Sequence, residues 1–496
     1  MNQSKQFYEF GDFRLDLVNK ALTRSNGENV PNAVLYQVPI LGGASRQVIS
    51  DIDSGISFSA DGSEFAFYRT APGAGLSQLL IAAADGTRQR VVAERTAPET
   101  FETEFGDPVW KPSERKILAI ATSNAPEGKS DVVEIDIETG ALRSFVEARR
   151  TEIHQIAWLK TTKSLLLVAP DERTRARQIW HIDPARGGYR RVTDDLSDYR
   201  GISLTNDEKI LITTRTEQIT KLRKTNDPAS GNADEILSET GTVAGDEGLA
   251  WTPDNRLVFS LGPHGADNIS IYDPSGIRPL IVDANGNRQP TVCGSFIVYA
   301  ANFVSTSPGA LRLWKMDADG KNARRLTPDG DASEMYPHCS ANSDWVVYQK
   351  GWEPATLWKI KVSGGAPVRL TKTSAFQPNV SPDGRRVAYY YLENNQWGIG
   401  IVSIDDGSLE KKIPVSSTGK LRHLRWTPDG KNLAFSETRG GVSNIRLQPA
   451  GEGAHFQLTH FDSGLIYYFD WSPDGKNFAY AQSTVSSDVV SITDAE

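Results

Sequence analysis

The amino-acid sequence predicts an all-β protein built from repeated four-stranded sheets, and three observations support this fold class. A phrase of the form Ser-Pro-Asp-Gly, followed by a short apolar strand, recurs throughout the 496 residues. Its copies lie roughly 41 to 52 residues apart, which is the length of one such sheet with its turns. The composition combines 42 Gly, 26 Pro, 11 Trp, 15 Tyr and 18 Phe with only three Met, which suits short strands joined by tight turns.

The clearest copies of the phrase predict β-hairpin turns. They occupy residues 59–67, 381–389, 427–435 and 472–480. Pro presets φ, the Asp side chain bonds to its own backbone, and Gly supplies a positive φ, so the chain turns back on itself. The residues that we assign to these turns, one of them from a weaker copy, are Asp61, Gly62, Asp254, Asp383, Gly384, Asp429, Gly430, Asp474 and Gly475.

Weaker copies fill the space between the clear ones and bring the total to ten. They begin near Trp110, Trp158, Thr205, Trp251, Val292 and Cys339. A single four-stranded sheet of this kind cannot bury both of its faces, so it is stable only when stacked on similar sheets around an axis. The sequence therefore predicts a β-propeller of about ten four-stranded blades.

The aromatic residue that ends the first strand of a repeat is predicted to pack between neighbouring blades. These residues are Phe58, Trp110, Trp158, Trp251, Trp426 and Trp471. Large aromatic side chains bury much area and dominate the packing of such interfaces, so we assign them to the core and not to ligand contact.

Ten blades are too many for an ordinary single ring, which usually holds four to eight. We therefore expect a six-blade ring from residues 245–496, preceded by an incomplete ring from residues 32–244, with residues 1–31 as a separate segment. One large ring of all ten blades is the alternative.

Charge and hydropathy argue against nucleic-acid binding and against a membrane span. The formal net charge is −8, and the short basic stretches lie among many acidic residues. No run of 18 apolar residues occurs, and residues 1–19 lack the features of a secretory signal. As written, the sequence predicts a soluble, cytoplasmic product.

The chain has two cysteines, Cys293 and Cys339. When the repeats are aligned on Pro290, Pro337 and Pro378, the two cysteines fall at neighbouring positions, which face opposite sides of a strand. We therefore expect Cys339 to be a small core residue and no disulfide to form between the two.

The sequence shows no catalytic, metal-binding or cofactor-binding motif. G-x-S-x-G and HExxH are absent, and the seven histidines are spread over separate repeats. Residues 317–322 imitate the start of a calcium loop, but Pro328 stands where such a loop needs its bidentate acid, so we predict a blade turn there. We expect no enzyme activity and no cofactor.

From about residue 35 to its end, the chain resembles the TolB-like, WD40-like (PD40) propeller repeats of bacterial signalling proteins. The resemblance is carried by residues 35–43, 178–180, 199–205 and 440–445. In that family the repeats follow either a winged-helix DNA-binding domain of the OmpR/PhoB type or a Ser/Thr kinase domain, and relatives can carry the propeller in the periplasm.

Residues 1–31 resemble the opening β-strands of that winged-helix domain, through residues 8–16, 21–24 and 27–31. Pro31 is followed at once by blade sequence, so the recognition helix, which reads bases in the major groove, is missing. The resemblance therefore implies a remnant of the domain, and we do not carry DNA binding over to this chain.

These observations predict a non-catalytic scaffold or sensor module in bacterial signalling. Propeller loops and the central channel are the surfaces on which such proteins bind another protein or a small ligand. One alternative is a winged-helix transcriptional regulator in which residues 1–31 still contact DNA. A weaker alternative is the propeller of a peptidase-like hydrolase, since propellers of this kind gate oligopeptidases in families that they resemble.

Overall fold

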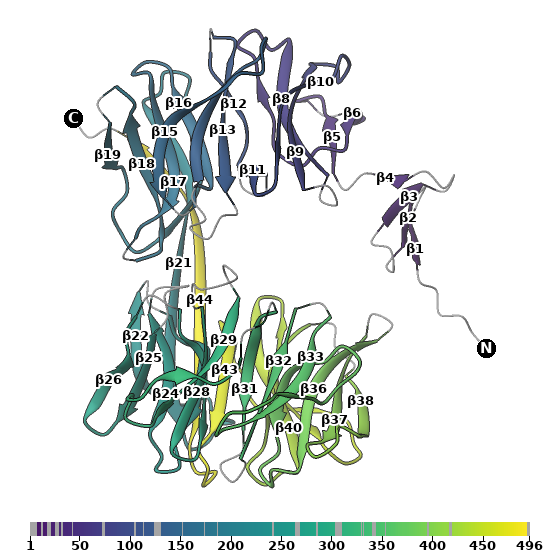
Figure 1. Ribbon diagram of the computed structural model, residues 1–496, viewed down its shortest axis with the longest axis vertical. Helices are drawn as coiled ribbons and strands as arrows, with labels where there is room; N and C mark the ends of the chain where they lie inside the picture. The colour runs from purple at the N-terminus through teal and green to yellow at the C-terminus, as the bar shows by residue number, and fades with distance from the viewer. Residues whose placement is uncertain are drawn as a thin grey trace. The chain divides into compact units, whose positions relative to one another are not determined.

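The computed structural model describes residues 33–493 and the backbone of four strands between residues 7 and 30. The parts of 33–493 left out are 42, 72–74, 104–105, 113, 124–129, 151, 173, 186, 241–242, 263–267, 284–285, 303–309, 329, 331, 340–343, 353, 394–395 and 416–418. Of residues 147–150, 239 and 240 the backbone alone is described. The elements in the described residues are strands, which confirms the all-β prediction (Figure 1).

The strands near the N-terminus form one antiparallel sheet in sequence order. They are β1 (Phe7–Phe10), β2 (Phe13–Asp16), β3 (Ala21–Arg24) and β4 (Asn29–Val30). The described part of residues 1–31 therefore consists of strands alone.

The chain divides into two compact units. Unit 1 comprises Met1–Glu172, Arg177–Arg215 and Asp488–Glu496, and unit 2 comprises Arg173–Ala176 and Thr216–Ser487. The division differs from the predicted boundary at residues 244 and 245. Residues 216–240, which precede that boundary, belong to unit 2. Residues 488–493, which follow it, belong to unit 1.

Unit 2 contains five sheets of four consecutive strands each. The first is β23 (Val243–Trp251), β24 (Leu257–Gly262), β25 (Asn268–Asp273) and β26 (Gly276–Ile281). The second is β27 (Arg288–Cys293), β28 (Phe296–Asn302), β29 (Leu311–Asp317) and β30 (Arg324–Arg325). The third is β31 (Glu334–His338), β32 (Trp345–Lys350), β33 (Thr356–Lys361) and β34 (Val368–Arg369). The fourth is β35 (Phe376–Val380), β36 (Arg386–Glu393), β37 (Gln396–Ser403) and β38 (Leu409–Pro414), and the fifth is β39 (Lys420–Trp426), β40 (Asn432–Arg439), β41 (Val442–Pro449) and β42 (Phe456–Gln457).

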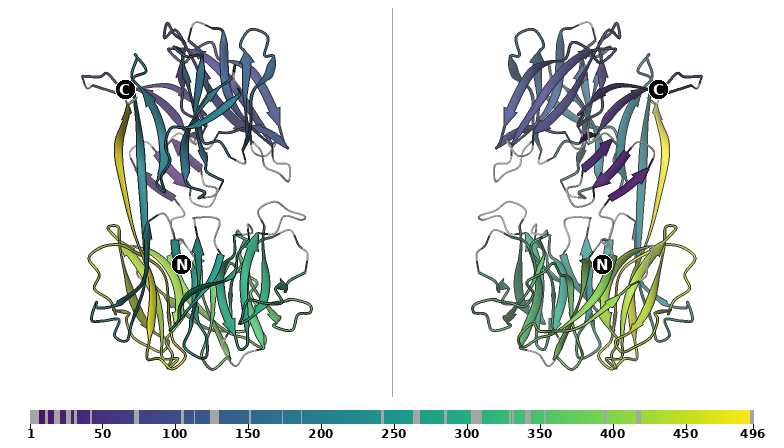
Figure 2. Two further views of the ribbon diagram at one scale, coloured as in Figure 1. Left: turned by 90° about the vertical axis from the view of Figure 1, so that its left-hand side faces the viewer. Right: turned by 90° about the vertical axis from the view of Figure 1, so that its right-hand side faces the viewer.

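A sixth sheet of unit 2 combines strands from both ends of its sequence. β43 (Leu465–Trp471) pairs with β44 (Phe478–Thr493), β44 pairs with β21 (Ile210–Thr225), and β21 pairs with β22 (Asp234–Thr240). Figure 2 shows β21 and β44 side by side. The first strands β23, β27, β31, β35, β39 and β43 contact one another in this order, and β43 contacts β23 again. Unit 2 is thus a closed six-blade ring.

Besides the sheet β1–β4, the described part of unit 1 contains three complete blades and two partial sheets. The complete blades are β7 (Ser57–Phe58) to β10 (Arg90–Thr96) through β8 (Glu64–Ala71) and β9 (Leu76–Ala83); β11 (Glu99–Phe101) and β12 (Val109–Trp110) with β13 (Lys116–Ser123), β14 (Ser130–Asp136) and β15 (Leu142–Arg150); and β16 (Gln155–Leu159) to β19 (Gly188–Arg191) through β17 (Ser164–Pro170) and β18 (Arg177–Asp183). The partial sheets are β5 (Val34–Gln37) with β6 (Arg46–Ser50), and β20 (Asp198–Leu204) with the first part of β21 and the last part of β44.

Three of the predicted blade aromatics are buried between neighbouring sheets. Trp110, Trp251 and Trp426 are 5 to 7% exposed. The indole N–H of Trp426 donates to the carbonyl oxygen of Asn379 on the preceding sheet at 3.2 Å, and Trp251 makes the same type of bond to Asp470 at 3.1 Å. These side chains therefore join adjacent blades by both packing and hydrogen bonding.

The other three aromatics are less enclosed. Trp158 and Trp471 are partly buried and pack against the cores of their blades. Phe58, in contrast, is 51% exposed, so it does not act as a buried plug. The physical reason is that the preceding sheet, β5–β6, has only two strands and leaves the aromatic position of β7 half uncovered.

Cys339 is a core residue, as expected, but the expectation that no disulfide forms is wrong, because Cys293 and Cys339 form one with their Cα atoms 5.8 Å apart. Both residues are buried, Cys293 at the end of β27 and Cys339 directly after β31. Residues that face opposite sides of equivalent strands do not meet within one blade. On two adjacent blades, however, opposite faces look into the same interface, and there the two sulfur atoms meet.

We expect Trp426→Ala to lower the free energy of unfolding by about 3 to 5 kcal/mol, since it leaves a cavity between two blades. Urea denaturation followed by circular dichroism measures this change. The control is Phe456→Ala, because Phe456 is 50% exposed on the outer strand β42, and surface substitutions typically change stability by about 0.5 kcal/mol or less. Equal losses for the two variants would contradict the placement of Trp426.

The disulfide predicts that the denatured, unreduced protein has no titratable thiol, since both cysteines are bonded. Reduction should release two thiols and lower the free energy of unfolding by about 4 kcal/mol, because the bond closes a loop between residues separated by 46 positions. Thiol titration in denaturant, with and without prior reduction, tests this. Two thiols before reduction would show that the bond does not form.

Candidate ligand-binding site

The first strands of all six blades in unit 2 are interrupted near the same position. The antiparallel register shifts between Ala244 and Leu249, Arg288 and Thr291, Met335 and His338, Phe376 and Asn379, Arg422 and Leu424, and Ile466 and Tyr468. A β-bulge of this kind bends the strand locally and redirects a side chain. The repeated bulge therefore changes which side chains face the axis of the ring.

Four of the bulges place a non-glycine residue in the left-handed region. The φ angles are 55° at Gln289, 52° at Tyr336, 49° at Gln377 and 41° at His423. For a residue with a Cβ atom this conformation costs about 1 to 2 kcal/mol. The first blade has Gly245 and Gly248 at its bulge, so glycine is used where no side chain is presented. Strain of this kind, kept at four equivalent positions, is a reason to look for function there.

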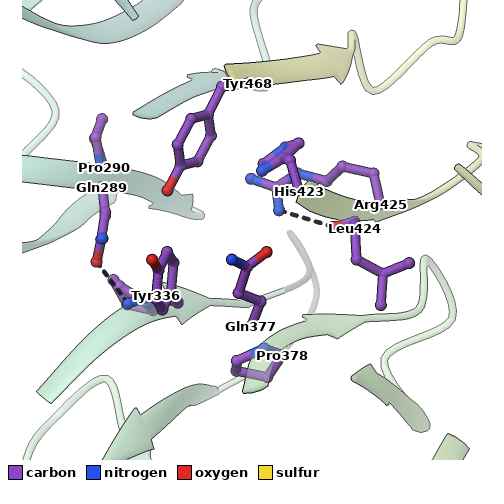
Figure 3. A pocket seen from close by; sticks show the side chains of 10 residues that line it. Gln289, Pro290, Tyr336, Gln377, Pro378, His423, Leu424, Arg425 and Tyr468 are labelled. Atoms are coloured by element: carbon purple, nitrogen blue, oxygen red, sulfur yellow. Dashed lines mark hydrogen bonds between the residues drawn. The ribbon is translucent and has the colours of Figure 1, made fainter. Parts of the chain in front are cut away.

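These side chains surround a small cavity of about 20 Å³. Figure 3 shows Gln289, Tyr336, Gln377, His423 and Tyr468 around it. Neighbouring blades are connected at this level, since the Gln289 side-chain oxygen accepts the backbone N–H of Tyr336 at 2.7 Å. The cavity is therefore built by strands from several blades.

Tyr336 and Gln377 also line two larger cavities. The first, which we call the channel cavity, has a volume of about 320 Å³ and is lined by Gln218, Asp246, Glu247, Tyr336, Gln377, Arg422, His423, Tyr467 and Tyr468. Arg422 lies over the ring of Tyr467, with 5.1 Å from its guanidinium carbon to the ring centroid. This cavity thus carries charges of both signs beside aromatic rings.

The second, which we call the aromatic pocket, has a volume of about 560 Å³. It is lined by Tyr336, Gln349, Trp352, Phe376, Gln377, Tyr390, Trp397 and Leu421. The rings of Phe376 and Trp397 meet edge to face at 5.6 Å, and Tyr390 approaches Trp397 at 6.2 Å. Trp352 is 61% exposed and Trp397 is 40% exposed, so apolar ring surface is available to a ligand. Volume and lining both suit a binding pocket.

Two histidines near the channel cavity are held neutral, His423, which is buried, and His338, which is half-buried. Burial keeps the pKa of His338 and of His423 well below the usual range, and the charge of Arg425 adds to the effect. His338 Nδ1 accepts the backbone N–H of Val380 at 3.0 Å, and His423 Nε2 lies 2.8 Å from the carbonyl oxygen of Phe469, so that nitrogen carries the proton. Both rings are thus fixed in tautomer and orientation.

An ion pair lies next to these histidines. Arg425 Nε is 3.7 Å from a carboxylate oxygen of Asp470. Burial raises the pKa of Asp470 to about 6, and the guanidinium of Arg425 opposes the rise. Burial also raises the pKa values of Tyr336, Tyr467 and Tyr468, so these phenols stay protonated and can donate hydrogen bonds.

The three cavities are lined by aromatic, amide, charged and apolar side chains. Their linings include no Ser, Thr, Cys or Lys side chain. Among the described residues, no group of three or more His, Cys, Asp and Glu side chains could hold a metal ion. In unit 1, His181 Nε2 lies 2.8 Å from the hydroxyl of Ser164, a pair that sequence analysis did not find. Ser164 is 1% exposed, so a substrate cannot reach its hydroxyl.

The residues assigned from the sequence lie outside these cavities. The turn glycines Gly62, Gly384, Gly430 and Gly475 have φ between 66° and 72°. The carboxylates of Asp61, Asp254, Asp383, Asp429 and Asp474 each accept a hydroxyl hydrogen from the Ser or Thr two positions earlier. The hydroxyl of Ser59 is the largest cause that lowers the pKa of Asp61 to about 2. Phe58, Trp110, Trp158, Trp251, Trp426 and Trp471 likewise line none of the three cavities.

Sequence analysis missed Gln289, Tyr336, Gln377 and His423. Three of them directly precede the prolines on which the repeats align, namely Pro290, Pro337 and Pro378. A large polar or aromatic residue before an aligned proline is the signal that could have found them. Its meaning depends on the left-handed backbone, which the sequence pattern does not reveal.

We expect Gln377→Gly to be more stable than Gln377→Ala by about 1 to 2 kcal/mol, since only the alanine variant keeps the cost of a Cβ atom at φ 49°. Urea denaturation of the two variants measures the difference. Because both variants lack the glutamine side chain, the comparison isolates the backbone. Equal stability would mean that position 377 is unstrained.

None of the described residues forms a helix that is long and apolar enough to cross a membrane. Residues 288–496 match the family model described as the TolB beta propeller domain, PD40. No curated protein matches the chain.

Among solved structures, a putative TolB from Agrobacterium tumefaciens is 15% identical, with a TM-score of 0.43 over 54% of this chain and 99% of that chain. TolB from Acinetobacter baumannii is 14% identical, with a TM-score of 0.31 over 72% and 82%. The β-propeller domain of the Trilobed protease from Pyrococcus furiosus is 13% identical, with a TM-score of 0.28 over 75% and 98%. The chain is a β-propeller protein whose residues 288–496 match the family model of the TolB beta propeller domain.

Proposed function

We propose that this protein is a non-catalytic scaffold that binds an extended segment of a partner protein at the channel cavity and aromatic pocket of unit 2. The observation that carries the proposal is the set of four left-handed residues, Gln289, Tyr336, Gln377 and His423. Glycine would relieve the backbone at each position, yet a side chain that borders the cavities is present instead. The aromatic, amide and charged side chains around these four residues support a role in binding.

The lining of the two cavities suits a peptide. Trp352, Phe376 and Trp397 offer flat apolar surface for an aromatic or proline side chain. Gln377 borders both cavities and can hydrogen-bond to a peptide backbone through its amide. Glu247 and Arg422 add charges of both signs in the channel cavity, which can fix the direction of an extended segment.

The absence of catalysis is part of the proposal. Ser, Thr, Cys and Lys act as catalytic nucleophiles when a base activates them, and none of these four residue types lines the described part of the three cavities of unit 2. The hydrolase alternative would regain support from turnover in a broad hydrolase screen.

The resemblance of residues 1–31 to a winged-helix domain predicts that the protein descends from winged-helix signalling proteins and acts in signalling. Both points stay predictions. Base reading in the major groove uses a helix, and the described part of this segment consists of strands. A mobility-shift assay at low salt tests the DNA-binding alternative. For the compartment, the Cys293–Cys339 bond favours an oxidising environment over the cytoplasm expected from the sequence.

The binding proposal is tested with a phage-displayed library of random twelve-residue peptides, selected on the full chain. We expect enriched peptides with an aromatic residue or proline, and a loss of affinity of tenfold or more in Tyr336→Gly and in Gln377→Gly, about 1.4 kcal/mol or more. Both substitutions remove a lining side chain and relieve the backbone, so the fold is kept. Fluorescence anisotropy with the enriched peptide measures the affinity.

The matched control is Lys163→Gly, which relieves a residue at φ 52° in a turn of unit 1 and lines none of the three cavities. It should bind the peptide as the unchanged protein does. If selection enriches no peptide, or if all three variants bind equally well, the proposed function is wrong.

A further inference from the structure

The two-stranded sheet β5–β6 of unit 1 has an open edge along β5. β6 is followed directly by β7, the first strand of the next sheet, as β26 is followed by β27 in unit 2. β5 and β6 therefore hold the places of the third and fourth strands of a blade. In a complete blade the third strand has a neighbour on each side, whereas β5 pairs only with β6 among the described strands.

Apolar side chains are exposed beside this edge. Phe58 is 51% exposed, although the equivalent Trp110 and Trp426 are 7% and 5% exposed. On β5 and directly after it, Tyr36 is 47% exposed and Val38 is 59% exposed. The second strand of the preceding blade covers the aromatic position in the other interfaces, as Tyr68 does for Trp110. The same place beside Phe58 is unfilled in the described structure.

The edge lacks the charges that protect other outer strands. Residues 33–41 contain no Asp, Glu, Lys or Arg. In contrast, the outer strands β19, β30, β34 and β38 all carry Arg or Lys. Charged residues on an edge strand prevent pairing with a further strand, and like charges directly opposite each other destabilise a pair. An uncharged edge can therefore lie against an identical edge without repulsion.

We propose that a second copy of this chain pairs with β5, strand β5 against strand β5, antiparallel across a two-fold axis. The joined sheet has the order β6-β5-β5-β6, with four strands like the complete blades. The two-fold axis makes the contact the same for both copies, so the assembly closes as a dimer and does not continue into a fibre. The strands of the second copy take the places beside Phe58 that the first two strands of a blade occupy elsewhere.

Light scattering after size-exclusion chromatography tests the proposal on the full chain over a concentration series. We expect the mass to approach twice 54.4 kDa for the unchanged protein and to stay at 54.4 kDa for Tyr36→Lys, because the four-residue strands of both copies then bring two ammonium groups close together. The control is Leu409→Lys, which adds the same charge at a 54% exposed apolar position on the outer strand β38 and should still dimerise. Circular dichroism shows whether the variants keep the fold.

A crosslinking measurement avoids reliance on a variant that dissociates. Because Cys293 and Cys339 are bonded to each other, Tyr36→Cys carries a single free thiol, and a short bismaleimide should give a covalent dimer in denaturing gels. Leu409→Cys should remain a monomer under the same treatment. A monomeric unchanged protein at every concentration, open-ended polymers, or a Tyr36→Lys variant that still dimerises would overturn the proposal.

Discussion

The structure depends on one constraint: a four-stranded sheet with apolar side chains on both faces must be covered on both faces by its neighbours. In unit 2 this condition is met around the whole ring, because β43 contacts β23 and the closing sheet takes strands from residues 210–225 and 478–493. Bonds between neighbours reinforce the packing, through the indole groups of Trp251 and Trp426 and through the disulfide. In unit 1 the same condition fails at β5–β6, and Phe58 shows the result.

Much of the fold could be predicted from the sequence because its signals are local. Each Asp-Gly turn and the apolar strand after it lie within about nine residues, so each hairpin follows from its own residues. The closing sheet of unit 2 could not be predicted in this way, since β21 and β44 are far apart in the sequence and pair only when the ring forms. The disulfide could not be predicted for a similar reason. Aligning the repeats shows which side of its strand each cysteine faces, but only the packing of two adjacent blades shows that these two sides meet.

The channel side chains were beyond sequence analysis for a different reason. Gln289, Tyr336 and Gln377 precede aligned prolines, and nothing in this pattern distinguishes an ordinary strand residue from one at a bulge. Their orientation follows from the left-handed backbone and from contacts between blades, such as the bond from the Tyr336 N–H to Gln289. The aligned prolines thus mark where these residues lie in each repeat, while contacts with neighbouring blades determine how their side chains are oriented.

The long strand β44 has a consequence for how the chain matures. Its residues 478–487 complete the ring of unit 2, and Val490 and Ile492 pack into the core of unit 1 beside Leu166 and Val168. Neither unit can acquire its full set of strands until β44 has been synthesised. During synthesis, the blades made before β44 must wait with open edges, and β44 then completes sheets in both units.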